Sequence, residues 1–141
     1  MSANNGAVSV KPGGRPLAVL VLAAGLGTRM RSSTAKVLHG MGGRPLIAYV
    51  LDAACRLSPD RLIVVVGHQA EEVEAACKKN GDCAATRFIL QPEQRGTGHA
   101  VRCAAPALAG FRGDVLIVYG DVPTLRAETL SAFVAGHERS G

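Results

Sequence analysis

Four short aliphatic runs, separated by segments of helical character, constrain the fold of this chain more than any other feature. Each run is rich in Val, Ile and Leu and is followed by a glycine or a polar break. The four runs cover Leu17–Leu22, Arg61–Val66, Arg87–Leu90 and Asp114–Tyr119. Apolar runs of this length are typical of strands that are buried on both faces of a parallel sheet. We therefore expect four buried strands.

The segments between the runs carry the signals of helices. Pro45 suits the first position of a helix whose apolar side chains, at residues 46, 47, 50, 51 and 54, form one stripe. Gly81 can end the second helix, and Pro106 can end or kink the third. These further helices are expected at Ala70–Lys79, Gly98–Ala105 and Ala127–Arg139.

This alternation of strands and helices predicts an α/β fold. Right-handed helical crossovers between parallel strands produce a Rossmann-like, doubly wound and mostly parallel sheet inside three α/β/α layers. Residues 1–15 are polar and rich in glycine, and we expect them to form a disordered tail before a domain that covers 16–141. Ligands of such sheets bind beyond the carboxyl ends of the strands, so a site is expected at the strand exits.

The positive charge of the chain is concentrated in its first third. The first acidic residue is Asp52, and six basic residues precede it in a chain of net charge +5. An anionic partner or a solvated surface would each account for this excess. Tyr49 is the only aromatic residue before Asp52, so a platform for stacking nucleic-acid bases is not expected. We predict a small phosphate ligand and no nucleic-acid partner.

The cysteines and the longest apolar run argue against a zinc site and a membrane segment. The four cysteines contain no C-x-x-C pair, and their spacing matches no zinc template. We expect them to be reduced core or surface residues. The run Leu17–Ala24 is too short to span a bilayer and leads into a glycine-rich loop. A cytoplasmic protein without a membrane partner is therefore expected.

The first strand exit, at residues 23–30, carries a glycine-rich loop that is followed by Lys36. A Walker loop needs a Gly-Lys pair, which the sequence lacks, and a dinucleotide fingerprint needs a small residue where Met30 stands. What remains is a loop whose backbone N–H groups approach phosphate oxygens while Arg29 and Lys36 supply charge. The alternative is a tight strand–helix turn with two solvated cations.

Polar residues follow two further strands. Gln91 offers a donor and an acceptor, the complement of a nucleobase edge, and residues 96–98 permit close backbone approach at a helix start. A glycine-rich helix cap is the alternative there. Asp121 follows the last strand as a single carboxylate of the kind that suits Mg²⁺, with an Asx-turn or a helix cap as the alternative. Together, the three exits fit a nucleoside triphosphate bound with Mg²⁺.

Four motifs resemble those of the sugar-nucleotidyltransferases. They are LAAGLGTRM at Leu22–Met30, KVLH at Lys36–His39, GTGHA at Gly96–Ala100 and YGDVP at Tyr119–Pro123. The first motif is shared broadly among nucleotidyltransferases, and the other three are more specific. As a set they resemble the uridylyltransferase domain of the bifunctional N-acetylglucosamine-1-phosphate uridyltransferases, over residues 17–135.

This resemblance implies transfer of a uridylyl group from UTP to N-acetylglucosamine 1-phosphate, with Mg²⁺ and with release of pyrophosphate. The nucleotide-binding residues that it implies are Leu22, Ala23, Ala24, Gly25, Gly27, Lys36, Gln91, Gly96 and Thr97. It also implies that Tyr119 and Gly120 contact substrate and that Asp121 binds the metal. Arg29 and Lys36 would be catalytic, because they neutralise the phosphates. No general base is expected, since the attacking sugar phosphate is already an anion.

The chain departs from this family in two respects. Ala35 stands where the family usually has Pro before the loop lysine. We also expect only the N-terminal part of the family's domain, without its second metal ligand, its remaining sugar-binding residues or the β-helix that supports trimers, so no oligomer is implied. An exposed apolar edge of the sheet is then expected. The open alternatives are a non-catalytic nucleotide-binding remnant and another sugar-phosphate nucleotidyltransferase of the same fold.

Overall fold

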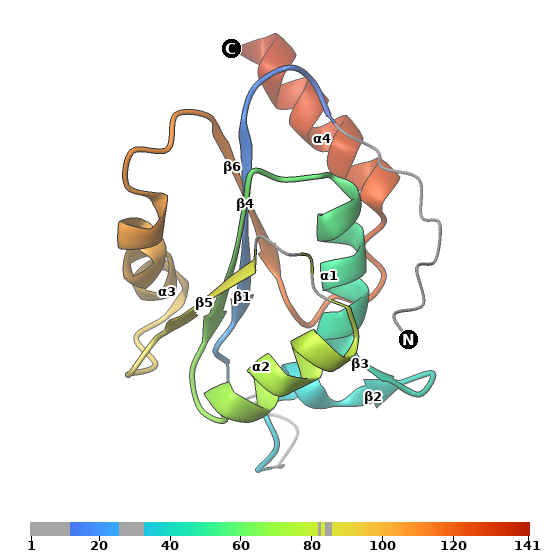
Figure 1. Cartoon of the computed structure of the whole chain (residues 1–141), viewed down its shortest axis with the longest axis vertical. Helices are drawn as coiled ribbons and strands as arrows, with labels where there is room; N and C mark the ends of the chain where they lie inside the picture. Colours follow the sequence, from blue (N-terminus) through green and yellow to red (C-terminus); the bar gives the residue numbers. More distant parts are fainter. Residues whose placement is uncertain (1–11, 26–32, 82, 84–85) are drawn as a thin grey trace.

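The structure, a computed structural model, describes residues 12–25, 33–81, 83 and 86–141 of the chain. Its centre is a four-stranded sheet in the order β5-β4-β1-β6, in which all neighbouring strands are parallel. The strands are β1 (Leu17–Ala23), β4 (Arg61–Val66), β5 (Thr86–Leu90) and β6 (Asp114–Tyr119). Figure 1 shows helices on both sides of this sheet, which confirms the predicted three-layer α/β fold.

The helices divide unequally between the two faces of the sheet. The larger core cluster packs the helices α1 (Leu46–Arg56), α2 (Ala70–Lys79) and α4 (Ala127–Ser140) onto one face. The smaller cluster packs α3 (Thr97–Ala104) and the 3-10 helix η3 (Ala105–Leu108) onto the other. The ribbon in Figure 1 follows the same division, with α3 alone on its side of the sheet. The face covered by α3 is therefore the thinner of the two layers.

The path of the chain places a switch point in the middle of the sheet. From β1 the chain moves outward to β4 and β5, and it then returns to pair β6 with the opposite edge of β1. The connections that leave β1 and β6 at their carboxyl ends therefore diverge to different parts of the molecule. In doubly wound sheets, this divergence creates the crevice in which ligands bind. The candidate site is expected between the exits of β1 and β6.

A small hairpin lies between η2, the 3-10 helix at Lys36–Leu38, and helix α1. Its strands are β2 (Gly40–Met41) and β3 (Arg44–Pro45). Gly42 and Gly43 form its turn with φ angles of 58° and 80°, a left-handed conformation that glycine adopts without a steric cost. The sequence analysis did not predict this hairpin. It placed Pro45 at the first helical position, whereas Pro45 ends β3 with extended dihedral angles and α1 begins one residue later.

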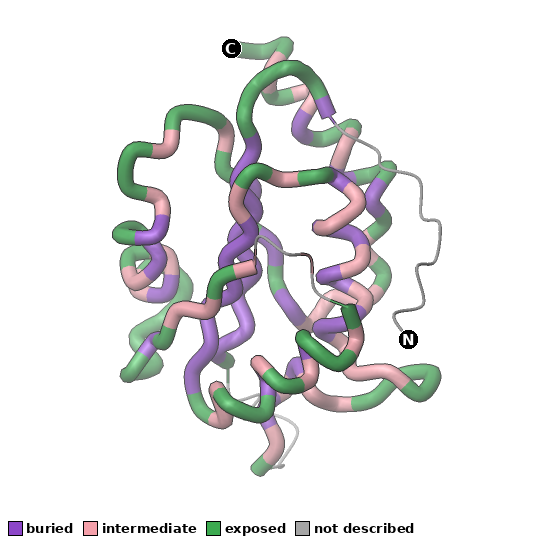
Figure 2. The backbone as a smooth tube through the Cα atoms, in the orientation of Figure 1, coloured by how far each residue is buried: buried purple, intermediate pink, exposed green. Residues whose placement is uncertain are grey.

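The core is built around β1, whose seven residues are all buried. Alternate side chains of β1 enter the two core clusters, with Val19 and Val21 on the side of α1 and Leu20 and Leu22 on the side of α3. Figure 2 shows buried chain concentrated in these central strands. A strand that is apolar on both faces is stable only when both faces are covered, and β1 meets that condition.

The two edge strands do not meet it, and the expectation of four fully buried strands is wrong at both edges. All residues of β5 are half-buried or exposed, and β6 is covered on one face only. Leu116 and Val118 are buried under α4, but Val115, Ile117 and Tyr119 are 43%, 46% and 54% exposed on the other face. The reason is that α3 covers only β1, β4 and β5 on that side. The exposed apolar edge that the sequence analysis expected is thus present at β6.

The segment before β1 belongs partly to the described residues. Residues 1–11 of the expected tail lie outside them, so the prediction of disorder there stays a prediction. Arg15 is placed, with a guanidinium nitrogen 3.7 Å from Asp114 Oδ1 and its backbone N–H donating to Glu138 Oε1. Among the helices of the described residues, none has the length and apolar character needed to cross a membrane.

Candidate nucleotide site at the carboxyl edge of the sheet

The exits of β1 and β6 approach each other closely because Gly120 has no side chain. The backbone N–H of Gly120 donates to the carbonyl oxygen of Leu22 at 2.9 Å. A Cβ atom on Gly120 would lie only 3.2 Å from that oxygen and 3.2 Å from Val37 Cγ1. Glycine therefore lets β1, β6 and η2 close together at the switch point. Gly120 acts on the site through backbone packing, as a side chain there would push η2 away.

An ion pair joins the two charged residues that the sequence analysis assigned to phosphate and metal. Lys36, at the start of η2, places its Nζ 2.7 Å from Asp121 Oδ2 in the turn after β6. The two side chains keep 43% and 25% of their surface exposed. The pair is therefore open to solvent and to an incoming ligand. The sequence predicted both residues but not their direct contact.

The chain before Lys36 is anchored by a side chain from another strand exit. The backbone N–H of Ala35 donates to Gln69 Oε1, and Gln69 itself has a left-handed backbone with φ of 59° at the start of α2. A proline at position 35 would have no N–H to donate. Alanine at this position thus allows a hydrogen bond to hold the segment that carries Lys36. The sequence analysis did not single out Gln69.

The residues after β1 can offer a ligand mainly their backbone. The side chains of Leu22, Ala23 and Ala24 are buried in the sheet, and only Gly25 is exposed. Small buried side chains keep the strand exit narrow, so a phosphate group would meet N–H groups rather than side chains. Gly27 and Arg29, which complete the predicted loop, lie outside the described residues.

A residue that the sequence analysis passed over, Gln94, ties three strand exits together. Its Nε2 donates to the carbonyl oxygen of Ala24 at 2.5 Å. A Cβ atom on Gly67, directly after β4, would lie 2.6 Å from the same Nε2 and 2.8 Å from the same oxygen. The side chain of Gln94 therefore lies over Gly67 and against the exit of β1. A glutamine in a polar loop gives no periodic signal, so only the fold reveals this role.

Gln91 is the one buried polar residue among the described core residues, with 3% of its surface exposed. Its Nε2 donates to the carbonyl oxygen of Gly96 at 3.3 Å and to His99 Nδ1 at 2.9 Å. His99 then carries its proton on Nε2, which lies 3.7 Å from Cys103 Sγ. The predicted base-reading amide is thus fixed within its own loop through its nitrogen.

The remaining predicted site residues lie at the start of α3 and at the end of β6. Gly96 has a φ angle of 89° directly before α3, and Thr97 begins the helix with an exposed side chain. The first N–H groups of a helix have no partner within the helix and can bind an anion. Tyr119 is exposed at the end of β6, and Gly120 is buried beside it. All predicted site residues that the structure describes therefore lie at the carboxyl edge of the sheet.

The donor set of the edge fits a metal that arrives with its ligand. Within the described residues, no group of three or more His, Cys, Asp or Glu side chains could hold a metal ion. Asp121 supplies one carboxylate, partly exposed and already balanced by the Lys36 ammonium group. Mg²⁺ commonly takes one or two carboxylates and completes its shell with phosphate oxygens and water. The edge therefore suits Mg²⁺ bound to a phosphate ligand better than a resident metal centre.

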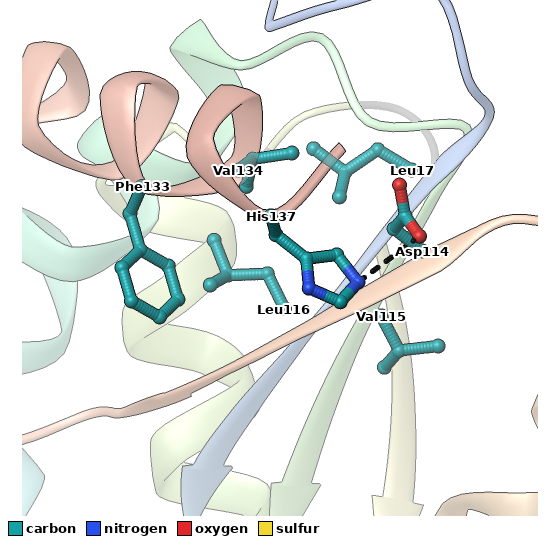
Figure 3. A pocket seen from close by; sticks show the side chains of 7 residues that line it. All are labelled: Leu17, Asp114, Val115, Leu116, Phe133, Val134 and His137. Atoms are coloured by element: carbon teal, nitrogen blue, oxygen red, sulfur yellow. Dashed lines mark ion pairs between the residues drawn. The ribbon is translucent and has the colours of Figure 1, made fainter. Parts of the chain in front are cut away.

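The cavity drawn in Figure 3 lies at the opposite end of β6 and takes no part in this site. It has a volume of about 110 Å³ and is lined by the first residues of β6 and by the last two turns of α4. His137 Nε2 lies 3.5 Å from Asp114 Oδ1 across it. Because the strands are parallel, this end is separated from the Lys36–Asp121 pair by the whole length of the sheet.

Comparison with known proteins decides the family. The model of the MobA-like NTP transferase domain matches residues 19–141. The chain belongs to this family. Its match includes every residue that the sequence analysis assigned to the site, and the doubly wound parallel sheet described above is that of a nucleotidyltransferase domain.

Individual proteins resemble the chain to different degrees. The bifunctional protein GlmU of Anaeromyxobacter sp. (strain K) is 54% identical over 125 residues, which are 89% of this chain and 26% of that protein. The crystal structure of Rv0371c from Mycobacterium tuberculosis superposes with a TM-score of 0.74 at 23% identity, over 90% of this chain and 63% of that one. A nucleotidyl transferase from Methanothermobacter thermautotroptrophicus gives a TM-score of 0.69 at 28% identity, over 88% and 58%.

The coverage and identity values show how far each likeness extends. The chain spans about a quarter of the length of the GlmU protein that it matches. The likeness to the Mycobacterium structure, which is also known as a manganese complex, concerns the fold. The fold is therefore common to all of these proteins, and the choice of substrates has to be argued from the site.

Proposed function

We propose that this nucleotidyltransferase domain binds UTP with Mg²⁺ and serves the transfer of a uridylyl group to N-acetylglucosamine 1-phosphate. The observation that carries the proposal is the Lys36–Asp121 ion pair at the switch point. It brings one cation and one carboxylate to the crevice where doubly wound sheets bind ligands. The high identity to GlmU proteins supports uridylyl transfer over other nucleotidyl transfers.

The chemistry that we propose is an in-line displacement at the α-phosphorus of UTP. A phosphate oxygen of the sugar phosphate forms the new P–O bond, and the bond to the leaving pyrophosphate breaks. The nucleophile is an anion at neutral pH, so no side chain has to remove a proton. Catalysis then consists of positioning and charge neutralisation. Lys36 and Arg29 supply positive charge to the phosphates in this proposal.

The metal is held, in our proposal, by Asp121 together with phosphate oxygens. Mg²⁺ supplies positive charge that neutralises the triphosphate. Both residues can serve a bound nucleotide in this way only if Lys36 exchanges partners, because its ammonium nitrogen lies 2.7 Å from Asp121 Oδ2. Asp121 would hold the metal and Lys36 would contact a phosphate oxygen, so that each charge would keep an opposite charge beside it. The pair thus holds both side chains in place until the nucleotide arrives.

Base recognition falls to the loop between β5 and α3. Gln91 Nε2 is engaged by Gly96 and His99, so Gln91 would meet uracil through its Oε1 atom, which accepts from the N3–H of the base. The backbone groups of Gly96 and Thr97 lie beside it at the start of α3. The exposed Tyr119, together with Gly120, is the proposed contact to sugar and nucleotide. We also propose a cytoplasmic location, where soluble substrates of this kind would be available.

Calorimetric titration of the full chain with nucleotides tests this proposal. We expect UTP with Mg²⁺ to bind, and CTP to bind at least tenfold more weakly because N3 of cytosine carries no hydrogen that it could donate to Gln91 Oε1. GTP should also bind at least tenfold more weakly, because its purine ring system is larger than uracil. Tighter binding of CTP or GTP would contradict the uridylyl assignment and favour another nucleotidyltransferase of this fold. A pyrophosphate-release assay with N-acetylglucosamine 1-phosphate then separates transfer from binding alone. UTP binding without turnover would identify the chain as a nucleotide-binding remnant.

A further inference from the structure

Two residues of α3 form a chain of contacts with the buried side chain of Gln91. Gln91 Nε2 lies 2.9 Å from His99 Nδ1, and His99 Nε2 lies 3.7 Å from Cys103 Sγ, one helical turn further on. Gln91 is 3% exposed, whereas His99 and Cys103 are half-buried. We propose that His99 is a positioning residue, which holds the Gln91 amide with its oxygen toward the base and thereby selects uracil over cytosine. This role rests on the proposed function, in which Gln91 reads the base.

The hydrogen-bond partners determine where the proton of His99 lies. The carbonyl oxygen of Gly96 can only accept, so the amide atom of Gln91 that lies 3.3 Å from it is the donor Nε2. His99 Nδ1, at 2.9 Å from the same Nε2, then accepts as well. The ring therefore carries its proton on Nε2, the nitrogen that faces Cys103 Sγ. Each of the two hydrogens of Gln91 Nε2 thus has an acceptor.

His99 makes the shorter of the two contacts to the Gln91 amide. Gly96 O is 3.3 Å from Nε2, against 2.9 Å for His99 Nδ1, and it also accepts from the backbone N–H of Ala100 at 3.2 Å. The backbone of Gln91 is held separately, because its N–H donates to the carbonyl oxygen of Val66 at 2.7 Å. The end of the sheet therefore fixes where the Gln91 side chain begins, and His99 fixes which way its amide is turned.

The direction of this amide decides which pyrimidine it can bind. With Nε2 held by His99, Oε1 is the atom left for a ligand, and no hydrogen bond from the described residues reaches it. Oε1 can accept from the N3–H of uracil, whereas N3 of cytosine has no hydrogen and needs a donor. A turned amide would supply that donor in nearly the same shape. It would also place Oε1 against two acceptors, and this penalty is what excludes cytosine.

Nuclear magnetic resonance of the full chain, with its histidines labelled with ¹⁵N, tests the geometry in the absence of nucleotide. His99 should show a protonated Nε2 and an unprotonated Nδ1, and its signals are assigned by their loss in His99→Asn. A His99 ring with its proton on Nδ1 would overturn the proposal, because Nδ1 could not then accept from Gln91. Since no ligand takes part, this result is independent of the proposed function.

Two variants of matched shape test the effect on the choice of base. His99→Asn keeps an acceptor, Oδ1, near the place of Nδ1, whereas His99→Leu has the same branching and no acceptor. Calorimetric titration with UTP and with CTP, each with Mg²⁺, gives the preference of each protein. Loss of one positioning hydrogen bond should lower a preference of about tenfold in the unmodified chain to about twofold in His99→Leu. His99→Asn should restore most of the preference.

A double-mutant cycle tests whether His99 acts through Gln91. In a Gln91→Ala background, His99→Leu should leave the remaining preference unchanged, because no amide is there to be turned. Thermal scans establish that each variant is folded. If His99→Leu does not fold, His99→Phe takes its place, since it keeps an aromatic ring but has no acceptor.

The outcomes separate this proposal from the proposed function. The role of His99 is overturned if His99→Leu keeps the preference of the unmodified chain, if His99→Asn behaves as His99→Leu does, or if the effect of His99→Leu persists in the Gln91→Ala background. Failure of the proposed function appears in the unmodified chain itself, which would then show no preference for UTP over CTP. That result would overturn the selection of uracil by His99 as well.

Discussion

The two ends of the central sheet are built on different principles. At the carboxyl end, the charged groups pair with each other in a half-exposed contact, as Lys36 does with Asp121. At the amino end, apart from the longer ion pairs of Asp114 with Arg15 and His137, the contacts involve the backbone. Leu17 N–H donates to Asp60 Oδ2 at 2.9 Å, and Asp60 N–H donates to the carbonyl oxygen of Leu17 at 2.8 Å. At the carboxyl end, the charged side chains can therefore replace their contact with each other by contacts to a ligand.

Arg61 shows how firmly the amino end is closed. Its Nη1 donates to the carbonyl oxygens of Ala107 and Ala109 at 3.0 and 3.1 Å, and its guanidinium group lies 5.2 Å from the centre of the Phe111 ring. An arginine committed in this way joins β4 to the segment after α3, and its Nη1 donors are already used. We conclude that an arginine or lysine near a strand end indicates a ligand site only when a ligand can replace the groups that it contacts.

Asp121→Ala should produce the largest functional effect. Removal of the carboxylate takes away the proposed metal ligand, and we expect pyrophosphate release by an active form, or Mg²⁺-dependent UTP binding by the chain itself, to fall at least hundredfold. The melting temperature should hardly change, because a half-exposed ion pair contributes about 0–1 kcal/mol to stability. Calorimetric titration with and without Mg²⁺, beside a thermal scan, checks both parts.

A matched variant sharpens this prediction. Lys36→Ala should weaken UTP binding both with and without Mg²⁺, since the lysine meets phosphate directly in our proposal. Asp121→Ala should instead abolish the difference between the two conditions. If both variants bind Mg²⁺ and UTP as the unmodified chain does, the ion pair is structural and the exchange of partners is wrong.

Arg61→Ala should produce the opposite pattern at the amino end. The variant loses two hydrogen bonds to carbonyl oxygens and the contact with Phe111, and we expect a loss of about 1–3 kcal/mol in the free energy of unfolding. UTP affinity should stay within twofold of the unmodified chain. Urea unfolding measures the loss of stability, and calorimetry measures the UTP affinity. If a folded Arg61→Ala variant lost UTP binding, the amino end would also contribute to the ligand site and the proposed difference between the two ends would be wrong.

The sequence predicted the elements of the sheet better than the contacts between them. The bounds of β4, β6 and α2 are confirmed as predicted, because their aliphatic runs and charged helix ends are strong local signals. The hairpin β2–β3 was missed since two-residue strands have no measurable periodicity. An exposed apolar edge was expected but was not assigned to β6, because an apolar run does not tell how many helices cover it.

The sequence predicted which residues belong to the candidate site, but it did not predict which of them contact each other. Asp121 and Lys36 are separated by most of the chain, and their contact depends on how η2 packs against Gly120. The hydrogen bonds of Gln69 and Gln94 depend equally on the meeting of distant strand exits. Such partners follow from topology, which the local sequence does not contain.

Gln94→Ala should have an intermediate effect at the carboxyl end. The variant leaves the carbonyl oxygen of Ala24 without its donor and opens the space above Gly67. We expect UTP affinity to fall about threefold to tenfold, together with about 1 kcal/mol of stability. Gln94→Glu serves as the control, because it keeps the size of the side chain but cannot donate when ionised. Equal affinity for UTP in all three proteins would remove Gln94 from the site.

The smallest effect is expected from Glu128, at the start of α4. A hydrogen bond from its own backbone N–H and one from Arg56 Nη2, 2.7 Å away, lower the pKa of this carboxyl group. A carboxyl group whose pKa is lowered in the folded state stabilises the fold above its unfolded pKa, and this contribution disappears as the pH falls through the folded pKa. Glu128→Gln should therefore unfold at a slightly lower urea concentration than the unmodified chain at pH 7, and the two midpoints should converge in acid.

Arg56→Gln serves as the control. Its midpoint should differ less from that of the unmodified chain at pH 7 and should also converge in acid, because the backbone hydrogen bond to Glu128 remains in that variant. A constant difference between the midpoints at every pH would mean that Glu128 acts through packing and not through its charge.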